Sequence, residues 1–162
     1  MKRLLLIDID GVLADCEHRL PYLKNKDYDS FYGVEMMNDP LIPDGKALFQ
    51  ALYDWRDGDR LVYLTSRPER TRNLTLGWLA MNDFPIPGPG LYSDVRLSMR
   101  PDGDYRKSEE MKLFQIERDK LLEKGNSPFG EMFYIDDQPQ NIEAVSKAYP
   151  QITSLLFRRA AA

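Results

Sequence analysis

Short apolar runs alternate along the chain with stretches in which apolar residues recur every three or four positions. The runs lie within residues 3–9, 61–65, 91–99, 132–135 and 152–157. Continuous apolar runs of this length are typical of strands buried on both faces, as in a parallel sheet. The spacing of three to four residues is typical of amphipathic helices. The pattern therefore predicts five strands connected by helices.

Four helices are predicted between these strands. They cover residues 44–57, 68–81, 108–124 and 139–148. Pro68 suits the first turn of the second helix, because a first-turn residue needs no backbone N–H donor. Ser108 can cap the third helix, and acidic residues follow it where the helix dipole favours negative charge. Strands that alternate with helices predict a doubly wound α/β fold around a parallel sheet.

Residues 15–43 interrupt this alternation. They are polar and aromatic, contain three prolines and show no sustained period. We expect a loop with one short helix near residues 28–37, which makes a small cap insertion after the first strand. The length of 162 residues fits one domain, so we expect residues 1–162 to form a single unit.

Composition narrows the chemistry. The net charge of −4 gives no global reason to bind polyanions or anionic membranes. A single cysteine and a single histidine exclude an internal disulfide and argue against a zinc site made of these residue types. Any metal would therefore need oxygen ligands. No apolar run is long enough for a signal peptide or a membrane span, so we predict a cytoplasmic protein.

Two acidic pairs follow predicted strands. Asp8 and Asp10 lie two residues apart, so in an extended segment both side chains point to the same side. Asp136 and Asp137 follow the fourth predicted strand. Parallel strands present their carboxyl ends at one edge of a sheet, which brings the two pairs together. Together they predict an oxygen cage for Mg²⁺. The alternative is that the first pair ends a strand and Asp137 caps a helix.

Polar residues with other chemistry lie at two further positions. Thr65 and Ser66 are predicted where a strand meets a helix N-terminus, a place that binds anions such as phosphate. Their alternative role is ordinary helix capping. Lys112 lies early in a predicted helix, where a cation opposes the dipole, so a nearby anion is expected. Otherwise its ammonium group extends to solvent.

Cys16 and His18 form a possible catalytic pair in the cap insertion. No acid or amide partner is indicated by the spacing, and a histidine in a loop is more often structural. The pair is therefore a minor alternative.

In chain order, these residues resemble the four motifs of the haloacid dehalogenase (HAD) superfamily of phosphatases. Residues 8–14 (DIDGVLA) look like the first motif, Thr65 the second, Lys112 the third, and Asp136 with Asp137 the fourth. Any one of them is weak evidence, but the four together are specific. The resemblance extends over nearly the whole chain.

Two further segments resemble the 3′-phosphatase domain of polynucleotide kinase/phosphatase proteins. They are residues 72–79 (RNLTLGWL) and 99–107 (MRPDGDYRK), followed by Lys112. Proteins of that family remove a phosphate from the 3′ end of a nucleic acid. The match covers residues 4–157, and the kinase half of such proteins is missing, so a separate kinase partner is conceivable.

The resemblance implies roles for the motif residues. Asp8 is the expected nucleophile and forms an aspartyl-phosphate, while Asp10 is the expected general acid and base. Mg²⁺ is expected to bind Asp8, the backbone carbonyl of Asp10 and Asp136, with Asp137 acting through a water. Thr65 and Lys112 are expected to hold the phosphoryl oxygens. The expected substrate-binding residues are Ser66, Arg67, Arg100 and Arg106, the arginines by contacting flanking phosphates.

Other functions are compatible with these motifs. A small-molecule nucleotidase or metabolite phosphatase would use the same residues. A phosphoryl-accepting switch or a degenerate regulatory domain would share the α/β layout, but a switch should lack an acid/base such as Asp10 two residues after the acceptor. The short cap insertion predicts an open cleft, which favours a bulky substrate such as a nucleic-acid end.

Overall fold

A single parallel sheet organises the chain. The computed structural model describes residues 2–53, 58–89, 94–122 and 128–160. The strands are β1 (Lys2–Ile7), β2 (Arg60–Pro68), β3 (Val95–Arg100), β4 (Phe129–Asp136) and β5 (Thr153–Leu156). Their order in the sheet is β3-β2-β1-β4-β5, and all four pairings are parallel. The doubly wound α/β fold predicted from the alternating pattern is confirmed.

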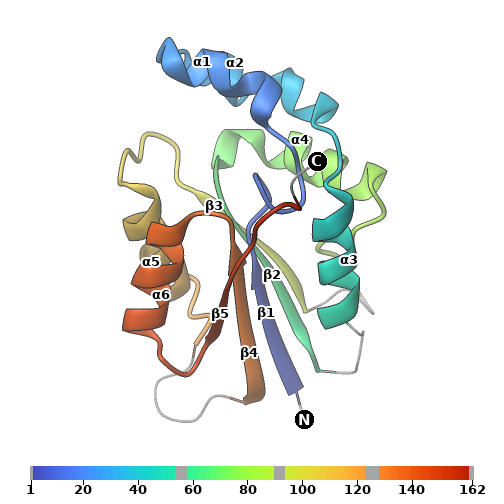
Figure 1. The fold of residues 1–162 in the computed structure, drawn as a ribbon, viewed down its shortest axis with the longest axis vertical. Helices are drawn as coiled ribbons and strands as arrows, with labels where there is room; N and C mark the ends of the chain where they lie inside the picture. The colour runs from blue at the N-terminus through green and yellow to red at the C-terminus, as the bar shows by residue number, and fades with distance from the viewer. Residues whose placement is uncertain (1, 54–57, 90–93, 123–127, 161–162) are drawn as a thin grey trace.

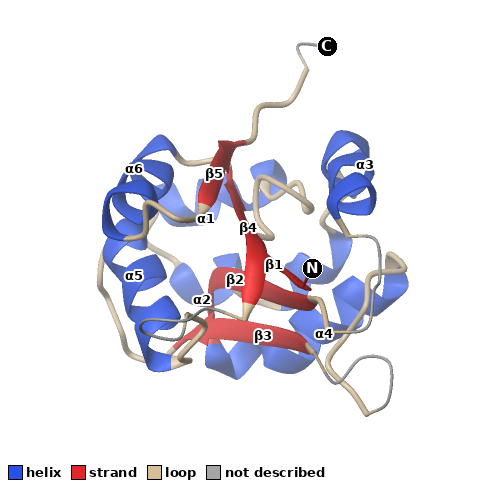
Figure 2. Cartoon of the chain, turned by 90° about the horizontal axis from the view of Figure 1, so that it is seen from below, coloured by secondary structure: helices blue, strands red, loops and turns tan. Residues whose placement is uncertain are grey.

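Helices cover both faces of the sheet. They are α3 (Pro43–Leu52), α4 (Arg72–Met81), α5 (Ser108–Arg118) and α6 (Pro139–Ala148). α3 and α4 lie on one face, and α5 and α6 lie on the other (Figures 1 and 2). Leu5 and Ile7 of β1 pack in the core on the α3 and α4 side, while Leu4 and Leu6 pack on the α5 and α6 side. Burial on both faces explains the continuous apolar run of β1.

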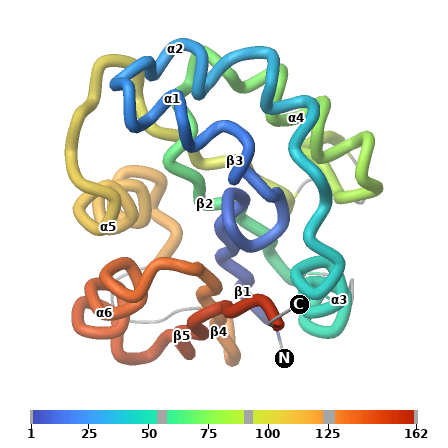
Figure 3. The backbone as a smooth tube through the Cα atoms, turned by 45° about the horizontal axis from the view of Figure 1, so that its top comes forward, coloured from blue at the N-terminus to red at the C-terminus, as the bar shows by residue number. Residues whose placement is uncertain are grey.

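The cap insertion, residues 15–43, is more helical than the sequence predicts. It contains η1 (Glu17–Arg19), α1 (Leu20–Lys24), α2 (Tyr28–Phe31) and η2 (Val34–Asn38) instead of one short helix in a loop. Segments of three to five residues are too short to show a helical period, which is why the pattern missed them. The cap insertion lies across the carboxyl ends of the strands (Figures 1 and 3).

Pro68 ends a strand, whereas the sequence predicted that it opens a helix. Its φ of −71° and ψ of 150° are extended, and it pairs with Arg100 of β3 after a shift in register that begins at Leu64. A short 3₁₀ turn, η3 (Glu69–Thr71), then leads into α4. Proline is tolerated at the end of a strand because no further ladder hydrogen bond is needed there. Thr65 therefore lies inside β2, and not at a helix N-terminus.

Two other predicted boundaries differ. Lys107, not Ser108, is the N-cap of α5, and no side chain caps this helix end. α5 ends at Arg118, earlier than the predicted 124, and Lys120 takes a φ of 47° just beyond it. The predicted ends of the first and third helices and the start of the third strand include residues 54–57, 123–124 and 91–93, which lie outside the described residues. Among the described residues, no helix is both long and apolar enough to cross a membrane.

Candidate active site

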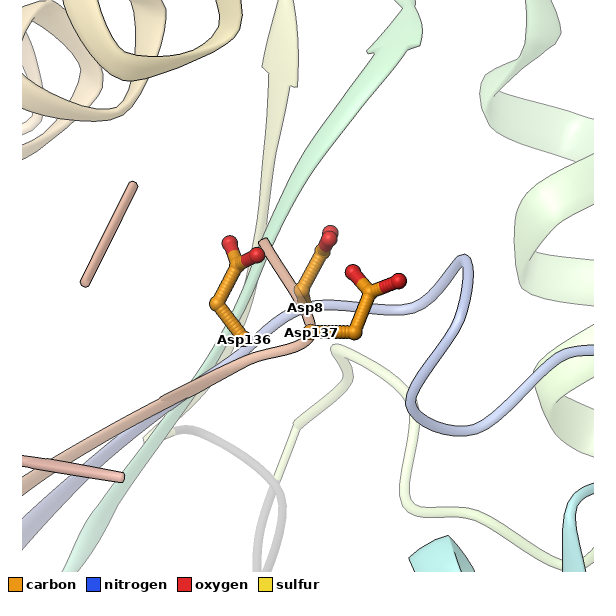
Figure 4. A group of neighbouring side chains, drawn as sticks. All are labelled: Asp8, Asp136 and Asp137. Carbon is orange, nitrogen blue, oxygen red and sulfur yellow. The ribbon is translucent and has the colours of Figure 1, made fainter. Parts of the chain in front are cut away.

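An acidic cluster lies at the carboxyl end of the two central strands. β1 and β4 pair in register at Ile7 and Ile135, and the backbone N–H of Asp8 donates to the carbonyl of Ile135 at 2.9 Å. The pairing places Asp8 beside Asp136, and Asp137 follows in the chain. Each of these three aspartates offers a carboxylate oxygen within 4.8 Å of the others (Figure 4). We call these three residues the acidic cluster.

Gly11 makes room for the third carboxylate. Its φ is +83°, and a Cβ atom at this position would lie 2.1 Å from Oδ2 of Asp137. A larger residue would both strain the backbone and collide with Asp137. The glycine of the DIDG segment is therefore required by the approach of a residue more than 120 positions away in the sequence.

Lys112 reaches the acidic cluster from the first turns of α5. Its side chain is fully buried, and its Nζ lies 2.9 Å from Oδ1 of Asp8 and 3.5 Å from Oδ2 of Asp136. It also donates to the carbonyl of Leu64. Burial alone would lower the pKa of Lys112, but the carboxylates of Asp8 and Asp136 outweigh it and raise the pKa. The alternative in which the ammonium extends to solvent is wrong.

The charges of the cluster do not balance, and this fits a cation. Burial raises the pKa of Asp8 well above its ordinary value, against the opposing charge of Lys112. Burial and the adjacent Asp136 raise the pKa of Asp137 to about 6. Oδ1 of Asp137 is buried without a hydrogen-bond partner. Three carboxylates facing one ammonium group form an all-oxygen ligand set that suits a hard cation such as Mg²⁺.

Asp136 is held in place by residues that the sequence analysis did not assign. Its carboxylate accepts hydrogen bonds from the Tyr134 hydroxyl, from Nδ2 of Asn141 at 3.0 Å and from the backbone N–H of Gln138 at 2.9 Å. Asn141 is fully buried. Asn141 lies four residues before Val145, so both share one face of α6, and both are buried. An amide at this spacing from an apolar residue was the signal by which the sequence could have identified Asn141.

Asp10 lies apart from the acidic cluster, in a second set of charges. Nε and Nη2 of Arg67 donate to its two carboxylate oxygens at 3.0 and 2.7 Å, and Nη2 of Arg19 donates to it at 3.0 Å. The same two arginines donate to Oδ2 of Asp39 at 3.0 and 2.6 Å. We call Asp10, Arg19, Asp39 and Arg67 the ionic network. Asp10 follows β1, Arg67 belongs to β2, and Arg19 and Asp39 lie near the two ends of the cap insertion.

The ionic network changes the expected role of one residue. Arg67 was expected to contact flanking phosphates of the substrate, but its side chain is fully buried and bound to Asp10 and Asp39. Arg19 and Asp39 were missed, because their pairing depends on how the cap insertion folds. Burial would raise the pKa of Asp10, but Arg67 and Arg19 outweigh it and lower the pKa. The two arginines therefore favour the ionised form of Asp10.

The other predicted site residues differ in how deeply they are buried. Thr65 is fully buried, and its Oγ1 accepts from the backbone N–H of Arg67 at 3.2 Å. Ser66 and Arg100 line a cleft that also contains Asp8 and Asp10, and Arg100 donates to the carbonyl of Ser66 at 3.2 Å. Arg106 is exposed, lies 3.6 Å over the ring centroid of Phe114 and does not line that cleft.

The cleft has a volume of about 450 Å³, and the cap insertion contributes part of its lining, including Cys16, Phe31 and Tyr32. Arg158 and Arg159, which the sequence analysis treated as a tail without function, also line it. Arg159 forms an ion pair with Asp15 at 2.8 Å, which fixes the tail against the start of the cap insertion. The lining of the cleft therefore combines residues from the N-terminal and C-terminal parts of the chain.

The Cys16 and His18 alternative is not supported. Burial raises the pKa of the Cys16 thiol to about 12, whereas a catalytic cysteine needs a lowered pKa. Nε2 of His18 lies 3.5 Å from Oδ1 of Asp39, at the edge of the ionic network. We therefore interpret Cys16 and His18 as structural residues.

Comparison with solved structures identifies the fold. Neither the protein-family models nor the curated proteins contain a match to the sequence. The HAD domain of the effector protein Lem4 from Legionella pneumophila superposes with a TM-score of 0.54 at 12% identity, over 96% of this chain and 85% of that chain. The chain has the HAD fold. A class C acid phosphatase from Bacillus anthracis shares this fold, with a TM-score of 0.51 at 14% identity over 96% of this chain and 66% of that one.

The same fold also occurs in a chain of a larger assembly. A chain of the Pnkp1/Rnl/Hen1 RNA repair complex superposes with a TM-score of 0.68 at 21% identity, over 97% of this chain and 42% of that chain. A second structure of the Pnkp1/Rnl/Hen1 complex is covered over 48% of its chain. The present chain thus spans less than half of the length of these two similar chains.

Proposed function

We propose that this chain is a HAD-type phosphatase that hydrolyses phosphomonoesters through an aspartyl-phosphate on Asp8. One observation carries the proposal. Asp8 lines a cleft at the carboxyl edge of the sheet, 2.9 Å from the ammonium group of Lys112 and within the acidic cluster. This arrangement combines a nucleophile, a buried cation and an oxygen ligand set. We further propose that residues 1–162 act as one phosphatase domain in the cytoplasm, with residues 15–43 as its cap.

The reaction divides into two displacements. In the first, a carboxylate oxygen of Asp8 bonds to phosphorus while the phosphorus–oxygen bond to the leaving group breaks, and Asp10 gives a proton to the leaving oxygen. In the second, water attacks the phosphorus of the aspartyl-phosphate, Asp10 takes the proton of the water, and inorganic phosphate leaves Asp8. Asp10 regains in the second step the proton that it lost in the first.

The ionic network influences whether Asp10 carries a proton. Arg67 and Arg19 lower the pKa of Asp10, so the ionised form, which is the base of the second displacement, predominates in the free protein. The acid role needs a proton, which a bound phosphate favours because its negative charge raises the pKa of a nearby carboxyl group. Substrate binding and proton uptake are therefore coupled in this proposal.

Lys112 and a bound Mg²⁺ are the proposed sources of charge stabilisation at Asp8. Lys112 holds Asp8 in place and offsets negative charge on the transferring phosphoryl group. Thr65 was expected to hold a phosphoryl oxygen, but it is fully buried, does not line the cleft and accepts from the backbone N–H of Arg67, so its proposed role is to orient that backbone. Asp8, Asp136 and Asp137, with the backbone carbonyl of Asp10, are the proposed ligands of Mg²⁺. When bound, Mg²⁺ supplies positive charge that reduces the repulsion between carboxylate and phosphate.

The proposed substrate is the 3′-phosphate at the end of a nucleic acid. The resemblance of residues 72–79 and 99–107 to polynucleotide 3′-phosphatase domains supports it, as does the similarity to a chain of an RNA repair complex. We also propose a separate kinase as a partner, because the proteins that residues 72–79 and 99–107 resemble combine a phosphatase with a kinase. A nucleotidase is the second candidate, since a cleft of about 450 Å³ is within the range of small-molecule sites.

Phosphate release from three substrates tests the proposal. They are a 3′-phosphorylated oligonucleotide, its 5′-phosphorylated isomer and a mononucleotide, each with Mg²⁺ and with EDTA. We expect Mg²⁺-dependent release and a preference for the 3′ isomer. Preference for the mononucleotide would move the function to nucleotide metabolism. Absence of release from all three, with folded protein, would contradict the phosphatase and favour a phosphoryl-accepting or regulatory domain.

A further inference from the structure

A groove continues from the active-site cleft towards the outside of the molecule. It runs between the cap insertion and the loop that joins β3 to α5, which lie near each other in Figures 1 and 3. Its volume is about 510 Å³. Tyr32 and Arg100 line both the cleft and this groove, so the two spaces meet at these side chains. A chain-like molecule with one end at Asp8 would leave the cleft along the groove.

The groove carries exposed aromatic side chains on both of its walls. Tyr28 of α2 is 51% exposed, and Tyr105 of the loop after β3 is 88% exposed. Among the residues that the structure describes, no other Phe, Tyr or Trp side chain is exposed. Two solvent-exposed rings are energetically unfavourable, because each leaves apolar surface unburied. Their position on opposite walls of one groove calls for a ligand with aromatic faces.

Polar contacts fix the walls relative to each other. Arg70 pairs with Asp29 of α2 at 2.8 Å, and its backbone N–H donates to Asp102 of the loop at 2.9 Å. Nη1 of Arg100 donates to the carbonyls of Asp104 and Arg106 at 3.0 and 2.8 Å, which holds the loop on either side of Tyr105. The two tyrosines are thus presented by segments that are tied together.

The charges of the groove are nearly balanced. Four cationic and three acidic side chains line it, namely Lys26, Arg70, Arg100 and Arg106 against Asp27, Asp29 and Asp104. Such a surface supplies phosphate contacts without strong general attraction for polyanions. Ring stacking, which is available to every nucleobase, is therefore the main source of affinity. Bases in a duplex already stack on each other, so the ligand that can use both rings is single-stranded.

We infer that this groove binds the single-stranded nucleotides that precede the 3′-phosphate, with bases stacked on Tyr105 and Tyr28. The inference rests on the proposed function, because it takes Asp8 as the position of the terminal phosphate. It adds the requirement for a free single-stranded end and the residues that recognise it. Arg106, which is exposed beside Tyr105, contacts the backbone of that strand in this arrangement.

The test compares variants on substrates of increasing length. The substrates are p-nitrophenyl phosphate, a nucleoside 3′-monophosphate and 3′-phosphorylated single strands of two to six nucleotides, in DNA and RNA series. The variants are Tyr105→Ala, Tyr28→Ala and Tyr105→Phe, with Met81→Ala as the control. Met81 is an exposed apolar residue of α4 that does not line the cleft or the groove.

We expect kcat/KM of the natural chain to rise over the first few nucleotides and then to level off. The ratio of kcat/KM for a single strand to that for p-nitrophenyl phosphate should fall about tenfold for each alanine variant, through KM. Tyr105→Phe should retain most of the ratio because the ring is kept, and Met81→Ala should keep all of it. An abasic strand should show little further loss with Tyr105→Ala, because the stacking partner is already absent.

A binding measurement separates this inference from the proposed function. Fluorescence anisotropy of a labelled 3′-phosphorylated single strand with the Asp8→Asn variant needs no turnover. About tenfold weaker binding when Tyr105→Ala is added supports the groove even if hydrolysis is absent. Equal binding with and without Tyr105, or no effect of strand length in a chain that hydrolyses p-nitrophenyl phosphate, would overturn the inference while leaving the phosphatase in place.

Discussion

The acidic cluster and the ionic network lie beside each other at the same edge of the sheet, yet their charges are organised in opposite ways. The acidic cluster sets three carboxylates against the single ammonium group of Lys112. The ionic network sets two arginines against two aspartates, and six hydrogen bonds join the guanidinium groups to the carboxylates of Asp10 and Asp39. One is left with excess negative charge, and the other is neutral.

The difference is visible in the acidity of the two aspartates of the DIDG segment. Burial raises the pKa of Asp8, while Arg67 and Arg19 lower that of Asp10 against the effect of burial. A charge set that neutralises itself stabilises one arrangement of the cap insertion, whereas an unbalanced set stores repulsion that a bound cation relieves. We therefore interpret the contacts of Arg19 and Arg67 with Asp39 as support for the cap insertion and for the proposed acid and base Asp10, and the acidic cluster as the place where a cation binds.

The largest expected effect follows from removing the nucleophile. Asp8→Asn should lower kcat by about 10⁴-fold or more, because Asp8 is the proposed nucleophile. Asp136 also pairs with Lys112, but it does not line the cleft as Asp8 does. Phosphate release with Mg²⁺ measures it, and circular dichroism shows that the fold is kept. Asp83→Asn is the matched control, since Asp83 is 92% exposed and its φ of 59° suits asparagine. Normal activity of Asp8→Asn would remove Asp8 from the mechanism.

The ionic network should be tested by breaking it. Asp39→Ala should reduce the free energy of unfolding by about 3–5 kcal/mol, because it leaves Arg19 and Arg67 buried with one carboxylate between them. Asp29→Ala, which removes an exposed partner of Arg70, should cost about 0–1 kcal/mol. Urea unfolding of both variants gives the comparison. Similar values for the two would show that the network adds nothing to stability.

Cys16 reports on burial beside the ionic network. Burial is the largest influence on its thiol and raises the pKa to about 12, with the nearby charges of Asp10 and Arg19 acting in opposite directions. Alkylation by iodoacetamide should be about 30-fold slower in the folded chain than in the same chain unfolded in urea, because the thiolate is scarce. Equal rates would mean that the Cys16 thiol is not buried as described.

The smallest expected effect concerns Asp137. Its folded pKa of about 6 exceeds its ordinary value of 3.8, so ionisation costs stability, increasingly as the pH rises from about 3.8 and fully above about 6. Asp137→Asn should therefore be more stable than the natural chain by about 1 kcal/mol at about pH 7.5 in EDTA, with the partial exposure of the side chain reducing the full linkage value.

Mg²⁺ should reverse the order of stability at this position. It should raise the Tm of the natural chain more than that of Asp137→Asn, because the variant has lost a proposed ligand. The difference in EDTA should vanish below about pH 3.8, where both chains carry a neutral side chain. A variant that is less stable in EDTA at both values of pH would contradict the interpretation of the acidic cluster as repulsive.

Much of this architecture could be predicted from local pattern. The apolar runs of β1, β2 and β4 identify a parallel sheet because both faces are buried, and the rule that reactive residues follow the strands brought Asp8 near Asp136. Helix boundaries were less accurate. Pro68 is compatible with both a helix start and a strand end, and only its pairing with Arg100 decided between them.

The ionic network was beyond the reach of the sequence. Along the chain, Arg19 and Asp39 look like ordinary surface charges and Arg67 looks like a substrate contact. The burial of all three depends on the fold of the cap insertion over β2. The groove between Tyr28 and Tyr105 is of the same kind, since its two walls are 77 residues apart. The sequence by itself determined the layers of the fold and the residue types at the reactive edge, because periodicity and strand order are local properties. Only the tertiary structure decided which carboxylate is neutralised and which is left for a cation, because charge balance depends on neighbours that are distant in the chain.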